Sequence, residues 1–178
     1  MHTLESRKLL FQVACSAVVC DGHIDDLEIK ELHYIDKSTP YFADIDLSSD
    51  IDIFVDRFKQ SGKQVVTESI EEVKKAELSP VLQLLLLELI LRLIYSDQHI
   101  EKDEIIFIKS IRAALPLSDD IIIERFGRID ILFSDDYERI KTHNQAIENI
   151  TTPKKDTMDF SSMYHTLPGK RSEERRVG

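Results

Sequence analysis

Two acidic stretches of the sequence share one pattern, and their oxygen-rich side chains are the residues best suited to chemistry. The first stretch, CDGHIDDLEI, covers residues 20–29, and the second, SDQHIEKDEI, covers residues 96–105. Both follow the pattern Asp-x-His-Ile-acid-x-x-Glu-Ile, and the second begins 76 positions after the first. The repeat places carboxylates at six matching positions: Asp21, Asp25, Glu28, Asp97, Glu101 and Glu104.

Helix capping explains much of this pattern. With Asp25 as the N-cap of a helix, Glu28 falls at the third helical position and completes a capping box. Ile24 and Ile29 then form a hydrophobic staple across the same helix start. The second copy repeats both the staple and the acid at the third position. Each copy is therefore predicted to begin a helix directly after a tight corner.

Capping leaves part of the pattern unexplained. Asp21 and Asp97 precede the corner, at the end of the previous helix, where the helix dipole disfavours negative charge. Glu101 keeps the charge of its counterpart in the first copy, but glutamate is not among the preferred N-cap residues. Negative charge, rather than cap geometry, is what the two copies have in common at these positions.

A second interpretation is cation binding, since each corner gathers three carboxylates. Two such charges about 5 Å apart repel by roughly 1–3 kcal/mol. A helix N-terminus offsets only about 0.3–1 kcal/mol per acid. Ligands that are all oxygen favour Ca²⁺ or Mg²⁺ over zinc, and three carboxylates leave room for water, which predicts weak, partly hydrated binding. Capping alone and cation binding both remain open from the spacing.

The spacing of the acids in the first stretch, and the two histidines, limit which type of metal site is possible. If Asp21 is counted as position 1 of an EF-hand loop, position 6 is Asp26 instead of Gly and position 12 is Leu32 instead of Glu, which excludes that motif. His23 and His99 occupy matching positions and could add imidazole ligands for a transition metal. Each follows a corner, however, and a solvent-exposed loop histidine is the simpler interpretation.

The sequence gives no support for an enzyme. It contains no nucleophile and base signature, no glycine-rich phosphate loop and no HExxH or CxxC motif. Cys15 and Cys20 are five positions apart on one predicted helix, so their side chains do not face each other and a disulfide is not expected. We interpret both as small core residues, in keeping with a reducing compartment.

Charge and hydropathy indicate where the protein acts. The 178 residues carry 33 Asp and Glu against 23 Lys and Arg, a net charge of −10. Such a field repels nucleic acid and anionic lipid and attracts cations or basic partners. The most apolar segment, residues 80–96, is interrupted by Gln83, Glu88 and Arg92 and is shorter than a bilayer requires. No export signal opens the chain, so we expect a cytoplasmic protein without direct membrane insertion.

Helical periodicity dominates the chain, and we predict an all-α fold of about eight helices in one domain over residues 1–150. Each acidic corner follows a long apolar helix and opens a shorter charged one, which predicts two pseudo-symmetric helical half-units. The predicted helices cover residues 4–20, 26–37, 49–59, 64–77, 80–96, 102–114, 119–128 and 136–148.

The sequence changes character after Ile150. Residues 151–170 are polar and show no apolar period, so we interpret them as a flexible tail. The last eight residues, RSEERRVG, read as the in-frame translation of a common sequencing adapter, so we interpret residues 171–178 as an adapter-derived artefact. On this interpretation the natural reading frame is interrupted near Lys170. A natural arginine-rich tail is the alternative.

The two corners resemble a known family. DGHIDDLE after an Ala-containing apolar helix, with DQHIEKDE as its second copy, resembles the TerB family of tellurite-resistance proteins and the related TerB-like domain of DjlA-type co-chaperones. The resemblance covers residues 4–150. Asp21, Gly22, Ile24 and Glu28 match the family motif, whereas the second copy has Gln98 in place of glycine.

The resemblance implies a TerB-like bundle with an acidic surface that binds divalent metal through the six carboxylates named above. It also implies a role in resistance to tellurite and other stresses, with Ter-system proteins at the membrane as partners. We therefore predict a non-enzymatic protein that binds Ca²⁺ or Mg²⁺ weakly. The alternative is a metal-free interaction adaptor, of the co-chaperone type, that docks a basic partner on its acidic face.

Overall fold

The computed structural model describes residues 3–24, 26–39, 41–42, 44–95, 100–136 and 139–140. These residues form an all-α fold with no strand among them, as the sequence predicts. The helices are α1 (Leu4–Val18), α2 (Asp26–Ser38), α3 (Ser48–Ser61), α4 (Gln64–Lys75), α5 (Pro80–Ile94), α6 (Lys102–Ala114), α7 (Asp119–Phe126) and α8 (Asp130–Phe133). The predicted arrangement in two half-units stays a prediction.

Helix α5 begins as the sequence predicts, because both of its start signals are local. The Ser79 side chain accepts a hydrogen bond from the Leu82 N–H at 3.4 Å, and Pro80 occupies the first turn, where no backbone donor is needed. Ten of the fifteen residues of α5 are buried, and nine of these are Leu or Ile. The helix packs against α1 and α6. The predicted interior helix is thereby confirmed.

The three polar side chains of α5 have partners within the protein. Glu88 forms ion pairs with Arg92 on the same helix, at 2.9 Å, and with Arg125 of α7. The buried Gln83 amide donates to the Leu78 carbonyl at 2.7 Å. Within the part of the chain that the structure describes, no helix is long and apolar enough to cross a bilayer.

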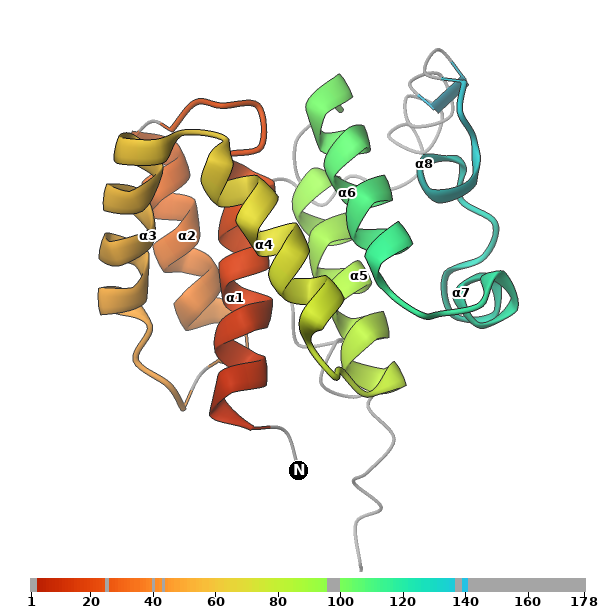
Figure 1. Cartoon of the computed structure of the whole chain (residues 1–178), viewed down its shortest axis with the longest axis horizontal. Coiled ribbons are helices and arrows are strands. Elements are labelled where there is room, and N and C mark those ends of the chain that lie inside the picture. The colour runs from red at the N-terminus through yellow and green to blue at the C-terminus, as the bar shows by residue number, and fades with distance from the viewer. Residues whose placement is uncertain are drawn as a thin grey trace, which may run out of the picture.

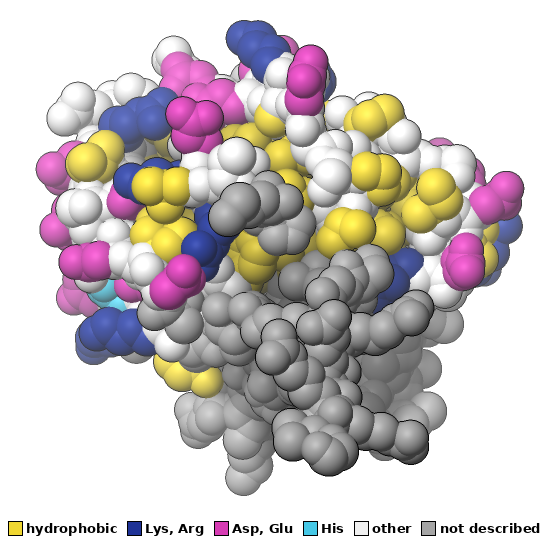
Figure 2. Space-filling view, turned by 90° about the horizontal axis from the view of Figure 1, so that it is seen from below, with side chains coloured by type: hydrophobic (Ala, Val, Ile, Leu, Met, Phe, Trp, Pro, Cys, Tyr) yellow, Lys and Arg dark blue, Asp and Glu magenta, His cyan; other side chains and the backbone are white. Residues whose placement is uncertain are grey.

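Helix α1 lies in the middle of the fold, between α2 and α3 on one side and α5 and α6 on the other, with α4 across it (Figure 1). A buried hydrogen bond of 2.7 Å joins Ser16 of α1 to Ser69 of α4. Nearby, Gln12 donates to Glu72 at 2.7 Å. One hydrophobic core runs from α1 to Ile140. Seen from below, hydrophobic side chains occupy the middle of the face, with many of the charged ones toward its edge (Figure 2).

The differences from the predicted boundaries are small. The helices that were predicted to reach residues 20, 96 and 128 end one turn or less earlier, at Val18, Ile94 and Phe126. The four-residue helix α8 was not predicted. Of the predicted last helix, Asp136 accepts from the Arg139 N–H at 3.1 Å, and residues 137–138 and those from 141 onward lie outside the described residues. The two predicted tail segments lie outside them as well.

Candidate functional site

The first acidic corner is a tight turn between α1 and α2. The Gly22 N–H donates to the Val19 carbonyl at 3.0 Å, and Gly22 has a φ of +98°. One carboxylate oxygen of Asp21 accepts from the His23 N–H at 2.8 Å, and the other lies 3.2 Å from His23 Nδ1. The His23 side chain is 84% exposed, which confirms the prediction of a solvent-exposed loop histidine. Asp21 therefore shapes the turn while a third of its side chain stays accessible.

The second corner is described from Ile100 onward, and it starts α6. Glu101 is the N-cap, with an extended backbone, and the Glu104 carboxylate accepts from the Glu101 N–H at 2.8 Å. This bond is the half of a capping box that the acid at the third position supplies. The capping interpretation is thus confirmed for Glu104. Asp103 lies beside these two acids in the first turn of α6.

Lys63, at the start of α4, bridges the two corners. Its ammonium lies 2.8 Å from a carboxylate oxygen of Asp103 in the second corner. Its aliphatic stem covers Gly22 in the first corner so closely that a Cβ atom added at Gly22 would lie 2.5 Å from Lys63 Cε. The pKa of Lys63 is raised, first by the hydrogen bond to Asp103 and also by the charges of Asp103 and Asp21. Acids of both corners therefore act on one ammonium group.

The buried thiol of Cys20 is also affected by acids of both corners. The side chain is 6% exposed, and its pKa is raised to about 12, first by burial and then by the charges of Glu104, Asp21 and Asp103. Both cysteines are free and buried, as predicted for core residues. A thiol with so high a pKa stays protonated at neutral pH and is a poor nucleophile. We name the region formed by Cys20, Asp21, Gly22, Lys63, Asp103 and Glu104 the corner junction.

The six predicted site residues are described to different extents. Asp21 and Glu104 belong to the corner junction, and Glu101 is exposed at its edge. Glu28 lies in α2, but its side chain is outside the description, and Asp25 and Asp97 lie outside the described residues altogether. His99 does too. Among the described side chains, no three His, Cys, Asp or Glu groups are arranged to hold a metal ion.

Sequence reasoning missed two members of the corner junction. Asp103 belongs to the second stretch but has no counterpart in the first, where Leu27 occupies the matching position. Lys63 follows a glycine between two helices, and nothing in its neighbourhood in the sequence marks it. Its partner Asp103 is 40 positions away, so only the packing of α4 against α6 brings the two together.

The comparisons with known proteins add no relative. Neither a family model, nor a curated protein, nor a solved structure matches the chain.

Proposed function

We propose that this protein is a non-enzymatic, TerB-like helical module that binds a divalent cation weakly through the acids of its two corners, around the corner junction. The observation that carries the proposal is the convergence of the two acidic stretches at Lys63, whose ammonium pairs with Asp103 of one stretch and whose stem covers Gly22 of the other. The resemblance to TerB proteins supports the same ligand. It also suggests a role in stress or tellurite resistance together with Ter-system partners.

Calcium or magnesium fits this junction better than zinc. The ligands on offer are carboxylate oxygens, which hard divalent cations prefer, and the thiol of Cys20 is buried and held protonated. The junction already contains one positive charge, that of Lys63, and two of its acids already accept backbone hydrogen bonds. A bound cation would therefore keep part of its water shell, and we expect a Kd of about 10⁻⁴–10⁻³ M, as in weak protein calcium sites.

Titration calorimetry with Ca²⁺ and with Mg²⁺ tests the proposal. We expect saturable binding by the full chain and its loss, by tenfold or more in affinity, in the double variant Asp21→Asn with Glu104→Gln. Both substitutions keep one oxygen that can accept the backbone hydrogen bond, and they remove the charge by replacing the second oxygen with an amide NH2. A loss of affinity would therefore reflect missing charge rather than a broken turn.

The matched control is Asp52→Asn with Glu77→Gln, two exposed acids outside the corner junction. This pair changes the net charge of the chain by the same amount. If both double variants weaken binding equally, the cation responds to the overall field and the proposed site is wrong. Thermal unfolding of each variant without metal checks that the fold is retained.

Replacing Lys63 by methionine makes a second prediction about the same site. Methionine keeps part of the stem that covers Gly22 and removes the ammonium. Because a like charge about 4 Å from a bound cation repels it even in a water-like medium, we expect Lys63→Met to bind Ca²⁺ about fivefold more tightly. The same calorimetric titration measures it. An unchanged or weaker affinity would mean that the cation, if bound, lies away from Lys63.

One observation favours the alternative function, a metal-free adaptor. The junction already holds an ammonium group at 2.8 Å from Asp103, so a lysine or arginine of a partner could be held by the same acids. In that case neither metal binds, and a short lysine-rich peptide binds instead. Its affinity would fall with added salt and in the Asp21→Asn with Glu104→Gln variant. These results would contradict the cation-binding proposal and support docking of a basic partner.

A further inference from the structure

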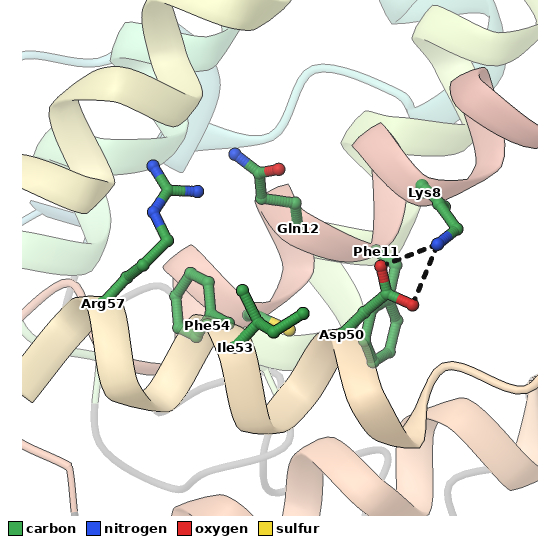
Figure 3. A pocket seen from close by; sticks show the side chains of 8 residues that line it. Lys8, Phe11, Gln12, Asp50, Ile53, Phe54 and Arg57 are labelled. Carbon is green, nitrogen blue, oxygen red and sulfur yellow. Dashed lines mark hydrogen bonds and ion pairs between the residues drawn. The ribbon is translucent and has the colours of Figure 1, made fainter.

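A small cavity lies between α1 and α3, and none of its lining residues belongs to the corner junction (Figure 3). Its volume is about 170 Å³. Three nearly buried side chains line it: Phe11, Cys15 and Phe54, with exposed fractions of 2%, 1% and 4%. Ile53 adds an apolar wall and is 59% exposed, so the cavity opens to solvent on that side.

The size of the cavity matches one six-membered ring. An engineered protein cavity of about 150 Å³ lined by Leu, Ile and Phe stays dry and binds benzene. The present cavity is of similar volume, and its aromatic and sulfur lining offers favourable contacts to a ring. It is smaller than the sites of about 300–1,000 Å³ that hold drug-sized ligands. A single ring with a short substituent is therefore the largest ligand that the cavity suits.

The charged groups at the rim are already paired. Lys8 Nζ lies 2.9 Å and 3.1 Å from the two carboxylate oxygens of Asp50, and Arg57 Nη2 lies 2.8 Å from a Glu68 oxygen. A charged ligand would meet a like and an opposite charge at the same rim. It would give up its hydration with little net attraction in return, so the rim favours a neutral ligand.

The rim still offers directional hydrogen bonding. A guanidinium group has five N–H donors, and Glu68 receives a bond from one of the Arg57 nitrogens. The Arg57 side chain is 42% exposed and lines the cavity together with the Gln12 amide (Figure 3). A ligand that carries one carbonyl oxygen could accept from Arg57 while its ring contacts Phe54. The two residues are three positions apart on α3, which places them on the same face.

We propose that this cavity is a binding site for a small neutral aromatic molecule with one carbonyl acceptor, of the aromatic amide class. The ring packs among Phe11, Cys15 and Phe54, and the carbonyl accepts a hydrogen bond from Arg57 at the rim. The site is independent of the cation-binding proposal, because it uses none of the acids of the corner junction.

Fluorine NMR of the full chain with three probes of one shape tests the ligand class. The probes are 4-fluorobenzamide, 4-fluorobenzoate and 4-fluorobenzylamine, which share the ring and differ in charge. We expect saturable binding of the amide with a Kd of about 1 mM, the range open to a ligand of this size. The two charged probes should bind at least about fivefold more weakly, since neither gains a free counter-charge.

Two substitutions locate the bound probe. Cys15→Met extends a flexible side chain into the cavity and should weaken amide binding tenfold or more while the melting temperature stays the same or rises. Arg57→Met should weaken the amide about tenfold, the size of one hydrogen bond to a charged donor, and leave fluorobenzene unaffected. Lys59→Met, on the exposed face of the same helix, is the control for lost positive charge.

The outcomes decide the proposal in either direction. Absence of saturable binding by all three probes overturns it, and so does equal or stronger binding of a charged probe. A folded Cys15→Met protein that still binds the amide overturns the location. If Cys15→Met does not fold, Arg57→Met decides: an effect no larger than that of Lys59→Met overturns the role of Arg57 at the rim.

Discussion

Replacing Ile108 by alanine is expected to lower the free energy of unfolding by about 2–5 kcal/mol, because the substitution leaves a cavity in a closely packed core. Ile108 lies on α6 and has no exposed surface. The core on which it depends is continuous from α1 to Ile140, so the loss should appear in one cooperative transition. Urea denaturation followed by circular dichroism measures it.

The chain supplies a matched control on the same helix. Ile106 lies two positions earlier on α6 and is 53% exposed. Ile106→Ala makes the same chemical change and gains the same helix propensity, a few tenths of a kcal/mol, with little loss of burial. We expect its stability to stay within about 0.5 kcal/mol of the parent chain. Equal effects at the two positions would contradict the packing of α6 described above.

Gly22→Ala is expected to lower the free energy of unfolding by more than the addition of one methyl group suggests, for two separable reasons. At a φ of +98° an alanine is strained by about 1–3 kcal/mol. In addition, its Cβ would meet Lys63 Cε at 2.5 Å, so the bridge across the corner junction must shift. Denaturant unfolding of Gly22→Ala, Lys63→Ala and the double variant forms a cycle that separates the two.

In the Lys63→Ala background the stem is gone, and only the backbone strain remains. We therefore expect Gly22→Ala to destabilise less there, with a coupling of about 0.5–3 kcal/mol, typical of side chains in direct contact. Additive effects on the free energy of unfolding would show that the Lys63 side chain moves aside without loss of stability. In that case the glycine of the DGHIDDLE motif serves the turn alone.

Most helix starts were predicted more accurately than the ends, although both ends of α6 were predicted correctly and α8 was missed. Starts are fixed by local signals, such as Ser79 followed by Pro80, and these act within one turn. The end of α1 was placed two residues too late because Val19 and Cys20 continue the apolar pattern and are buried, although they lie beyond the helix. Helix α8 was missed because four residues are too few to display a helical period.

The candidate site was predictable only in part. Repetition in the sequence identified Asp21 and Glu104 as related acids, and the fold does bring their stretches together around Cys20. The counter-charge could not be found in this way, because Lys63 belongs to neither stretch and pairs with Asp103 through tertiary packing. The cavity between α1 and α3 was not foreseen for a similar reason, since it depends on how two helices pack.

The bridge made by Lys63 also bears on the order in which the chain folds. It needs three segments at once: the turn at Gly22, the start of α4, and the first turn of α6, 40 positions beyond Lys63. Contacts between such distant segments are slow to form, because the intervening loops must first close. We expect the bridge to be absent from the folding transition state, so that its removal speeds unfolding and leaves the rate of refolding almost unchanged. The corner junction would then slow unfolding without changing the rate of folding, and so lengthen the lifetime of the native state.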